Sequence, residues 1–132
     1  MKKSDLKRIN YLNKEICKLE AKKHEIDSEL TSIKSTSDFK MLVQESIKKS
    51  DYKEMLISEK IGIEKEILEK KNELDEKIRI LMICVSNLNN ESKKLIKYRY
   101  VFGLSFQKVA KLMNYSESYI FSLHNKIVKR LD

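Results

Sequence analysis

The residues of this chain that could do chemistry lie near its C-terminal end, and the chemistry they suit is anion binding. Ser105 and Ser116 stand eleven residues apart, and each precedes a segment with helical spacing of apolar residues. Serine favours the start of a helix, where free backbone amides bind phosphate and carboxylate groups. Cationic and phenolic side chains that could bind the same anions follow the two serines: Lys108, Lys111, Tyr119, Lys126 and Lys129.

No arrangement of side chains in the sequence is typical of an enzyme. His24 and His124 are isolated, and Cys17 and Cys84 lack the spacing of a metal site or a redox pair. The sequence contains no glycine-rich phosphate loop and no set of nucleophile and base. We therefore expect no catalysis, no cofactor, no metal, and free thiols at both cysteines.

Composition and charge predict long helices and an acidic partner. The 132 residues include no proline and only two glycines, Gly62 and Gly103, so residues that interrupt helices are nearly absent. The formal net charge is +8, and residues 91–132 hold 9 Lys/Arg against 3 Asp/Glu, whereas residues 1–90 hold 19 against 17. A basic segment of this kind is typical of nucleic-acid binding. Without a signal peptide or a run of about 20 apolar residues, we expect a cytoplasmic protein.

Residues 1–90 are expected to form a helical, coiled-coil-like arm. Its first helix should begin near Ser4 or Asp5, and apolar residues then recur at heptad spacing from Ile9 to Ile33, with Lys23 at the one interrupted seam position. A polar break at 34–38 and a short amphipathic piece through Phe39, Leu42, Val43 and Ile47 precede a long helix over about 51–88. The two long helices could fold back as an antiparallel hairpin or pair with those of a second chain, and the spacing leaves both open.

Residues 91–132 are expected to form three short helices, the first ending at Gly103. The second covers 106–113, with an inner face of Val109, Ala110, Leu112 and Met113. Asn114 tolerates a left-handed turn. The third begins after Ser116, with an inner face of Ile120, Leu123, Ile127 and Leu131. A short helix, a three-residue turn and a second capped helix, with a small alanine where they cross, make a helix-turn-helix.

The stretch YRYVFGLSFQKVAKLMNYSESYIFSLHNKIVKRL resembles the last DNA-binding region of bacterial sigma factors. It is still more similar to the phage-encoded, sigma-like transcriptional regulators of the RinA/ArpU late-activator type, which join such a domain to a helical N-terminal segment. Lys108 stands where that family often has glutamate, and Asn114 where it usually has glycine. The resemblance implies a phage or prophage regulator that acts on promoter DNA in the nucleoid of a bacterial host.

In such a domain the helix 117–131 lies in the major groove. The resemblance places four of its residues at base edges, Glu117, Ser118, Phe121 and Ser122, and Asn125 also faces outward. Glutamate can accept from a cytosine amino group, asparagine can bond adenine, and phenylalanine can pack on a thymine methyl group. The expected phosphate contacts are Ser105, Lys108, Lys111, Ser116, Tyr119, Lys126 and Lys129. Tyr119 and Phe121 have a second interpretation, in which they pack against the arm.

Two other functions fit the same pattern. The arm could be the active surface of a protein-interaction module that docks on RNA polymerase or another protein. A DNA-packaging small subunit also combines a helix-turn-helix with helical oligomerisation, and it would form a ring. The expected partners are thus double-stranded DNA, with RNA polymerase and a second copy of the chain as further candidates.

Overall fold

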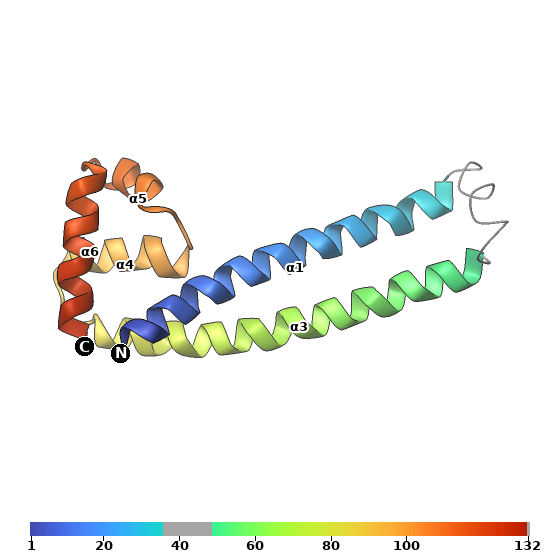
Figure 1. The fold of residues 1–132 in the computed structure, drawn as a ribbon, viewed down its shortest axis with the longest axis horizontal. Coiled ribbons are helices and arrows are strands. Elements are labelled where there is room, and N and C mark those ends of the chain that lie inside the picture. The colour runs from blue at the N-terminus through green and yellow to red at the C-terminus, as the bar shows by residue number, and fades with distance from the viewer. Residues whose placement is uncertain (36–48, 132) are drawn as a thin grey trace. The chain divides into compact units, whose positions relative to one another are not determined.

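A computed structural model describes residues 1–35 and 49–131. Helices make up most of this part of the chain and no strand occurs in it, which confirms the all-α prediction (Figure 1). The elements are α1 (Lys3–Ser35), α3 (Lys49–Cys84), α4 (Asn90–Ile96), the π-helix η1 (Lys97–Val101), α5 (Phe106–Met113) and α6 (Glu117–Leu131). The short helix predicted through Phe39, Leu42, Val43 and Ile47 lies outside the described residues. Among the described helices, none is long and apolar enough to cross a membrane.

Backbone contacts divide the chain into two compact units. Unit 1 consists of Met1–Lys14 with Asn72–Asp132, and unit 2 is Glu15–Lys71. Both long helices therefore contribute to both units. The predicted boundary at residue 90 divides the chain by function, into a helical arm and a DNA-binding segment. That functional division stays a prediction.

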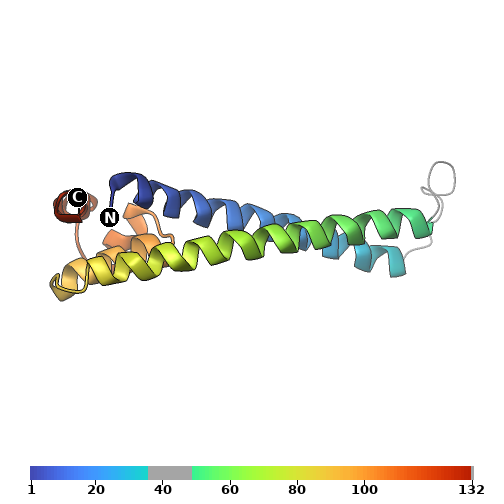
Figure 2. The ribbon, with the colours of Figure 1, turned by 90° about the horizontal axis from the view of Figure 1, so that it is seen from below.

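In unit 2, α1 and α3 run in opposite directions and pack through apolar side chains (Figure 2). The core is Ile26, Leu56, Ile63 and Ile67, with Leu19, Leu30 and Tyr52 packed against it. Lys23, which interrupts the stripe of α1, and Lys60 of α3 are each paired across the two helices: Lys23 Nζ lies 3.5 Å from Glu64, and Lys60 Nζ lies 2.6 Å from Asp27. The hydrogen bond from Lys60 lowers the pKa of Asp27. A charged seam position is thus tolerated because the opposite helix supplies its counter-ion.

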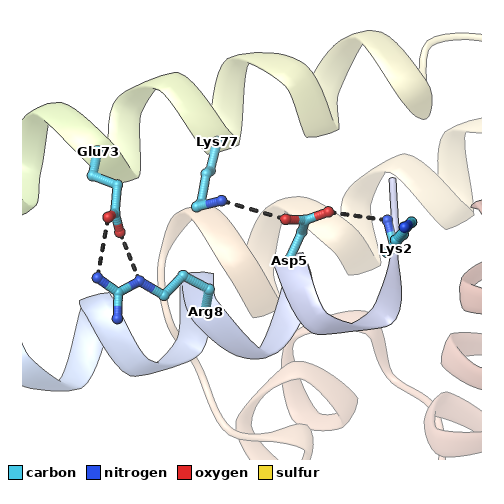
Figure 3. Close-up of polar contacts among 5 residues, drawn as sticks. All are labelled: Lys2, Asp5, Arg8, Glu73 and Lys77. Carbon is cyan, nitrogen blue, oxygen red and sulfur yellow. Dashed lines mark hydrogen bonds and ion pairs between the residues drawn. The ribbon is translucent and has the colours of Figure 1, made fainter.

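In unit 1, two ion pairs join the first turns of α1 to the last turns of α3 (Figure 3). Arg8 contacts the Glu73 carboxylate through Nε at 2.8 Å and Nη2 at 3.1 Å, and Lys77 Nζ lies 3.4 Å from Asp5. Asp5 also accepts the backbone N–H of Lys2, so α1 begins at Lys3, slightly before the predicted start. The buried side chains of this part are Leu6, Ile9, Leu12, Leu74, Leu81 and Val85.

The junction between α3 and α5 differs from the prediction. The α3 helix ends at Cys84, four residues before the predicted end, and a turn in which Leu88 N–H donates to Val85 carries the chain to Asn89. The Asn89 side chain accepts from Ser92 N–H at 2.8 Å and so begins α4. The helix then continues as the wider π-helix η1, where Phe102 N–H donates to the Lys97 carbonyl, five residues back. Gly103, at φ 67°, ends this segment as predicted.

Candidate nucleic-acid interface

Two capped helices and a left-handed turn form the centre of the candidate site. Ser105 Oγ accepts from Lys108 N–H at 3.3 Å to begin α5, and Ser116 Oγ accepts from Tyr119 N–H at 3.1 Å to begin α6. Between them Asn114 adopts φ 60° and ψ 41°, and Tyr115 N–H donates to Ala110 across the turn. The two serines and the asparagine thus have the local conformations expected from the sequence.

Buried apolar residues fix α6 within unit 1. Val109, Ala110, Ile120, Ile127 and Val128 are all buried, whereas Leu123 and Leu131 are half-buried. The prediction that Leu112 belongs to the inner face of α5 is wrong, because its side chain is 57% exposed. The buried face of α5 consists of Val109 and Ala110. Phe106, one turn before Ala110, is half-buried on the same side.

A polar and aromatic cluster supports α6 from behind. The Tyr100 hydroxyl lies 2.6 Å from His124 Nε2, and the ring of Phe106 meets His124 edge-on at 4.9 Å between centroids. The Arg99 guanidinium stacks over Phe106 at 4.2 Å and donates through Nη1 to the Leu104 carbonyl at 2.9 Å. Burial, together with the charges of Arg99 and Lys3, lowers the pKa of His124 to about 4, so the ring is neutral near pH 7. His124 thus packs between Tyr100 and Phe106 in this cluster.

Four residues predicted from the sequence to contact DNA lie on one outward-facing stripe of α6. Ser118, Ser122, Asn125 and Lys129 are exposed and follow one another at helical spacings of 4, 3 and 4 residues, with Lys126 beside them. No acidic side chain occurs on α6 after its first residue, Glu117. The stripe therefore presents hydroxyl, amide and ammonium groups that can bond base edges and phosphates.

The remaining predicted base contacts lie on one flank of that stripe. Glu117 and Phe121 are both exposed, one turn apart on α6. The Phe121 ring meets Phe106 edge-on at 5.5 Å while keeping 52% of its surface exposed. Phe121 therefore packs against Phe106 of α5 and is still accessible, and both sequence interpretations of this residue stay predictions.

Tyr119, predicted to contact phosphate, lies on the other flank. Its hydroxyl donates to the Glu91 carboxylate, 3.3 and 3.4 Å from the two oxygens, and its ring lies 4.6 Å from that of Tyr115. A phosphate at this place would meet the negative charge of Glu91. The predicted phosphate residues Ser105, Lys108, Lys111, Ser116, Lys126 and Lys129 are all exposed.

A groove of about 520 Å³ separates the first turns of α1 from α6. Its cationic lining residues are Lys3 and Lys7 from α1, Arg99 from η1 and Lys129 from α6, and Phe121 and Asn125 also line it. The sequence pattern places residues 1–14 in the arm. It does not predict that the first turns of α1 line a groove together with α6. The available signal was the apolar stripe of α1, which extends back from Ile9 to Leu6 and so requires a partner for the first two turns.

Comparisons with family models, with curated proteins and with solved structures give no match to this chain. The resemblance to sigma-like phage regulators accordingly stays a prediction from the residues quoted above. Among the described residues, no three histidine, cysteine or acidic side chains gather as a metal ion would need. Cys17 and Cys84 are both free thiols.

Proposed function

We propose that this protein is a sequence-specific DNA-binding transcriptional regulator of the phage-encoded, sigma-like type, and that α6 reads promoter DNA. The observation that carries the proposal is the pair of capped helices, α5 and α6, joined through the left-handed Asn114 and packed through buried Val109, Ala110 and Ile120. A helix-turn-helix requires this arrangement, because its second helix must be held rigidly while one face stays open to the major groove.

The chemistry of the open face supports the same function. Ser122 and Asn125 offer both donors and acceptors to base edges, and Lys126 and Lys129 offer positive charge to the backbone. Glu117, the one acidic side chain in α6, lies in its first turn, away from these lysines. Affinity should therefore fall steeply with salt, as phosphate contacts require.

Selection of bound duplexes from fragmented and random DNA, followed by sequencing, tests this proposal. We expect one enriched motif with the unaltered protein. The Ser122→Ala/Asn125→Ala double variant should relax the preference at about two positions, since each good base contact is worth about 1–3 kcal/mol of discrimination. These residues are better suited than Phe121, whose removal would also open a space beside Phe106. Salt-sensitive retention of every duplex without enrichment would count against sequence-specific reading.

A second candidate function, protein association through the arm, is favoured by exposed apolar residues on α3. Ile57, Ile61 and Leu68 lie on one face of α3 in unit 2, and the last two are each 60% exposed. In this proposal α1 and α3 form a hairpin within one chain, and the exposed face binds a second copy or another protein. Sedimentation of the Ile61→Gln/Leu68→Gln variant should give a smaller mass than the unaltered protein if copies associate there. A mass near eight chains would instead favour a DNA-packaging ring.

A further inference from the structure

The groove between α1 and α6 in unit 1 carries positive charge without a carboxylate to balance it. Lys3, Lys7, Arg99 and Lys129 line it, and none of its lining residues is acidic. Asp5, in the first turns of α1, is paired with Lys77 on the side that faces α3, where Glu73 is likewise paired with Arg8 (Figure 3). The charged side chains in the lining of the groove are therefore all cationic, and Asp5 is paired on the other side of α1.

The placement of the α1 lysines follows from helical geometry. Asp5 and Arg8 face α3, whereas Lys3 and Lys7, which are four residues apart, share the face that lines the groove. A further contact fixes α1 against η1, because Asn13 Nδ2 donates to the Tyr100 carbonyl at 2.9 Å. The charge of Lys3 is one of the causes that lower the pKa of His124, which places this ammonium group within electrostatic reach of α6.

The groove suits an extended anion better than a small one. Lys3, Lys7 and Lys129 are exposed along its edge, so a ligand that enters can continue past it. Arg99 is held at its floor by Phe106 and by the Leu104 carbonyl, and its buried Nε has no hydrogen-bond partner within the described part of the chain. Arg99 thus supplies a fixed positive field, and the three lysines supply flexible contacts. A phosphodiester backbone, with one charge per nucleotide, matches a row of such cations.

We infer that the first two turns of α1 are part of the DNA-binding surface, with Lys3 and Lys7 contacting phosphates of the strand that flanks α6. This inference rests on the proposed function, because Asn125 and Lys129 border both the groove and the outward stripe of α6. It adds residues from the opposite end of the sequence to the interface. The contacts would fix the position of α6 along the groove of the DNA and would carry no base preference themselves.

The test is the salt dependence of DNA binding by the full chain, measured with the enriched duplex and with a scrambled one. We expect the Lys3→Ala/Lys7→Ala variant to lower the slope of log K against log salt by about 1.8, or about 0.9 for each lost phosphate contact. Affinity for both duplexes should fall by a similar factor, leaving the sequence preference unchanged. The Lys3→Arg/Lys7→Arg variant, which keeps the charge, should restore the slope.

The matched control is Lys18→Ala/Lys65→Ala, which removes the same charge from exposed positions in unit 2. If this control and Lys3→Ala/Lys7→Ala change the slope equally, only net charge matters and the inference is overturned, while the proposed function stands. If the unaltered protein binds neither duplex, the proposed function and the inference are both wrong. Circular dichroism of each variant should match that of the unaltered protein, because the four altered lysines are all exposed.

Discussion

The Tyr100 hydroxyl and His124 Nε2 lie 2.6 Å apart, and this contact joins the π-helix η1 to the middle of α6. Tyr100 is 2% exposed, and burial raises its pKa, so its hydroxyl remains protonated beside a neutral imidazole. Two groups that are ionisable in water are therefore held uncharged behind the candidate recognition surface. The geometry of that surface should therefore depend on pH.

The first prediction is a loss of stability in mild acid. An unfolded histidine titrates near 6.5 and the pKa of folded His124 is about 4, so between these values the unfolded chain binds more protons. The contribution of His124 is complete above pH 6.5 and is lost as the pH falls towards 4. One proton limits the slope to about 1.4 kcal/mol per pH unit, and solvent at the partly exposed ring reduces it. Urea unfolding between pH 4 and 7 measures it.

His24 provides the control for this measurement, because it is exposed on α1 in unit 2. His124→Gln should flatten the fall in the free energy of unfolding between pH 6.5 and 4, since glutamine cannot take up the proton. His24→Gln should leave the curve unchanged. Identical pH curves for His124→Gln and the unaltered protein would mean that the imidazole is solvated and that carboxylates alone cause the acid sensitivity.

The two glycines predict opposite effects of the same substitution. Gly62 lies inside α3, and nothing lies within 4 Å of an added Cβ, so Gly62→Ala should stabilise the protein by about 1 kcal/mol. Gly103 has φ 67°, and an added Cβ would lie 3.5 Å from the Asn13 side chain, so Gly103→Ala should destabilise the protein by about 1–2 kcal/mol. Urea unfolding followed by circular dichroism measures both. Stabilisation by Gly103→Ala would contradict the left-handed turn after η1.

Local signals in the sequence predicted the helices of the candidate site well. Ser105, Asn114 and Ser116 each act through the backbone next to them, so residue type and spacing were enough to place the start of α5, the turn and the start of α6. The heptad stripe of α1 likewise predicted its buried residues from Ile9 to Ile26, and Lys23 at the interrupted position is paired with Glu64. The end of α3 was missed because Val85 is buried and Leu88 is half-buried in the following turn, which prolongs the helical period.

Features that depend on distant segments could not be predicted in this way. The π-helix η1 brings the Tyr100 carbonyl to Asn13, 87 residues away in the sequence, and no local pattern specifies that contact. The same holds for Lys3 and Lys7, whose place beside α6 depends on how α1 packs in unit 1. Tyr119 matched a phosphate contact by residue type, but its partner in the structure is Glu91 from α4.

The capping serine at the start of α6 predicts a stability change that a neighbouring serine does not share. Ser116→Ala removes the acceptor for Tyr119 N–H and should cost about 1 kcal/mol of unfolding free energy. Ser118→Ala is the control, because Ser118 is exposed on the outward stripe and makes no cap. Its stability should stay close to that of the unaltered protein, while its DNA preference should change. Equal stabilities for the two variants would contradict the capping geometry.

Charge reversal on α6 separates a DNA-binding surface from a protein-docking surface. Lys126 and Lys129 are exposed, so Lys126→Glu/Lys129→Glu should leave the helical circular dichroism signal unchanged. If these lysines contact phosphates, affinity for every duplex should fall by at least tenfold and the salt slope should decrease by about 2. Lys18→Glu/Lys65→Glu makes the same change in net charge within unit 2 and should retain most of the affinity and the slope. Because a phosphate contact is independent of base identity, the loss should be equal for the enriched and scrambled duplexes. A loss confined to the enriched duplex would instead assign the two lysines to base contacts, and no loss would mean that DNA does not lie along this face of α6.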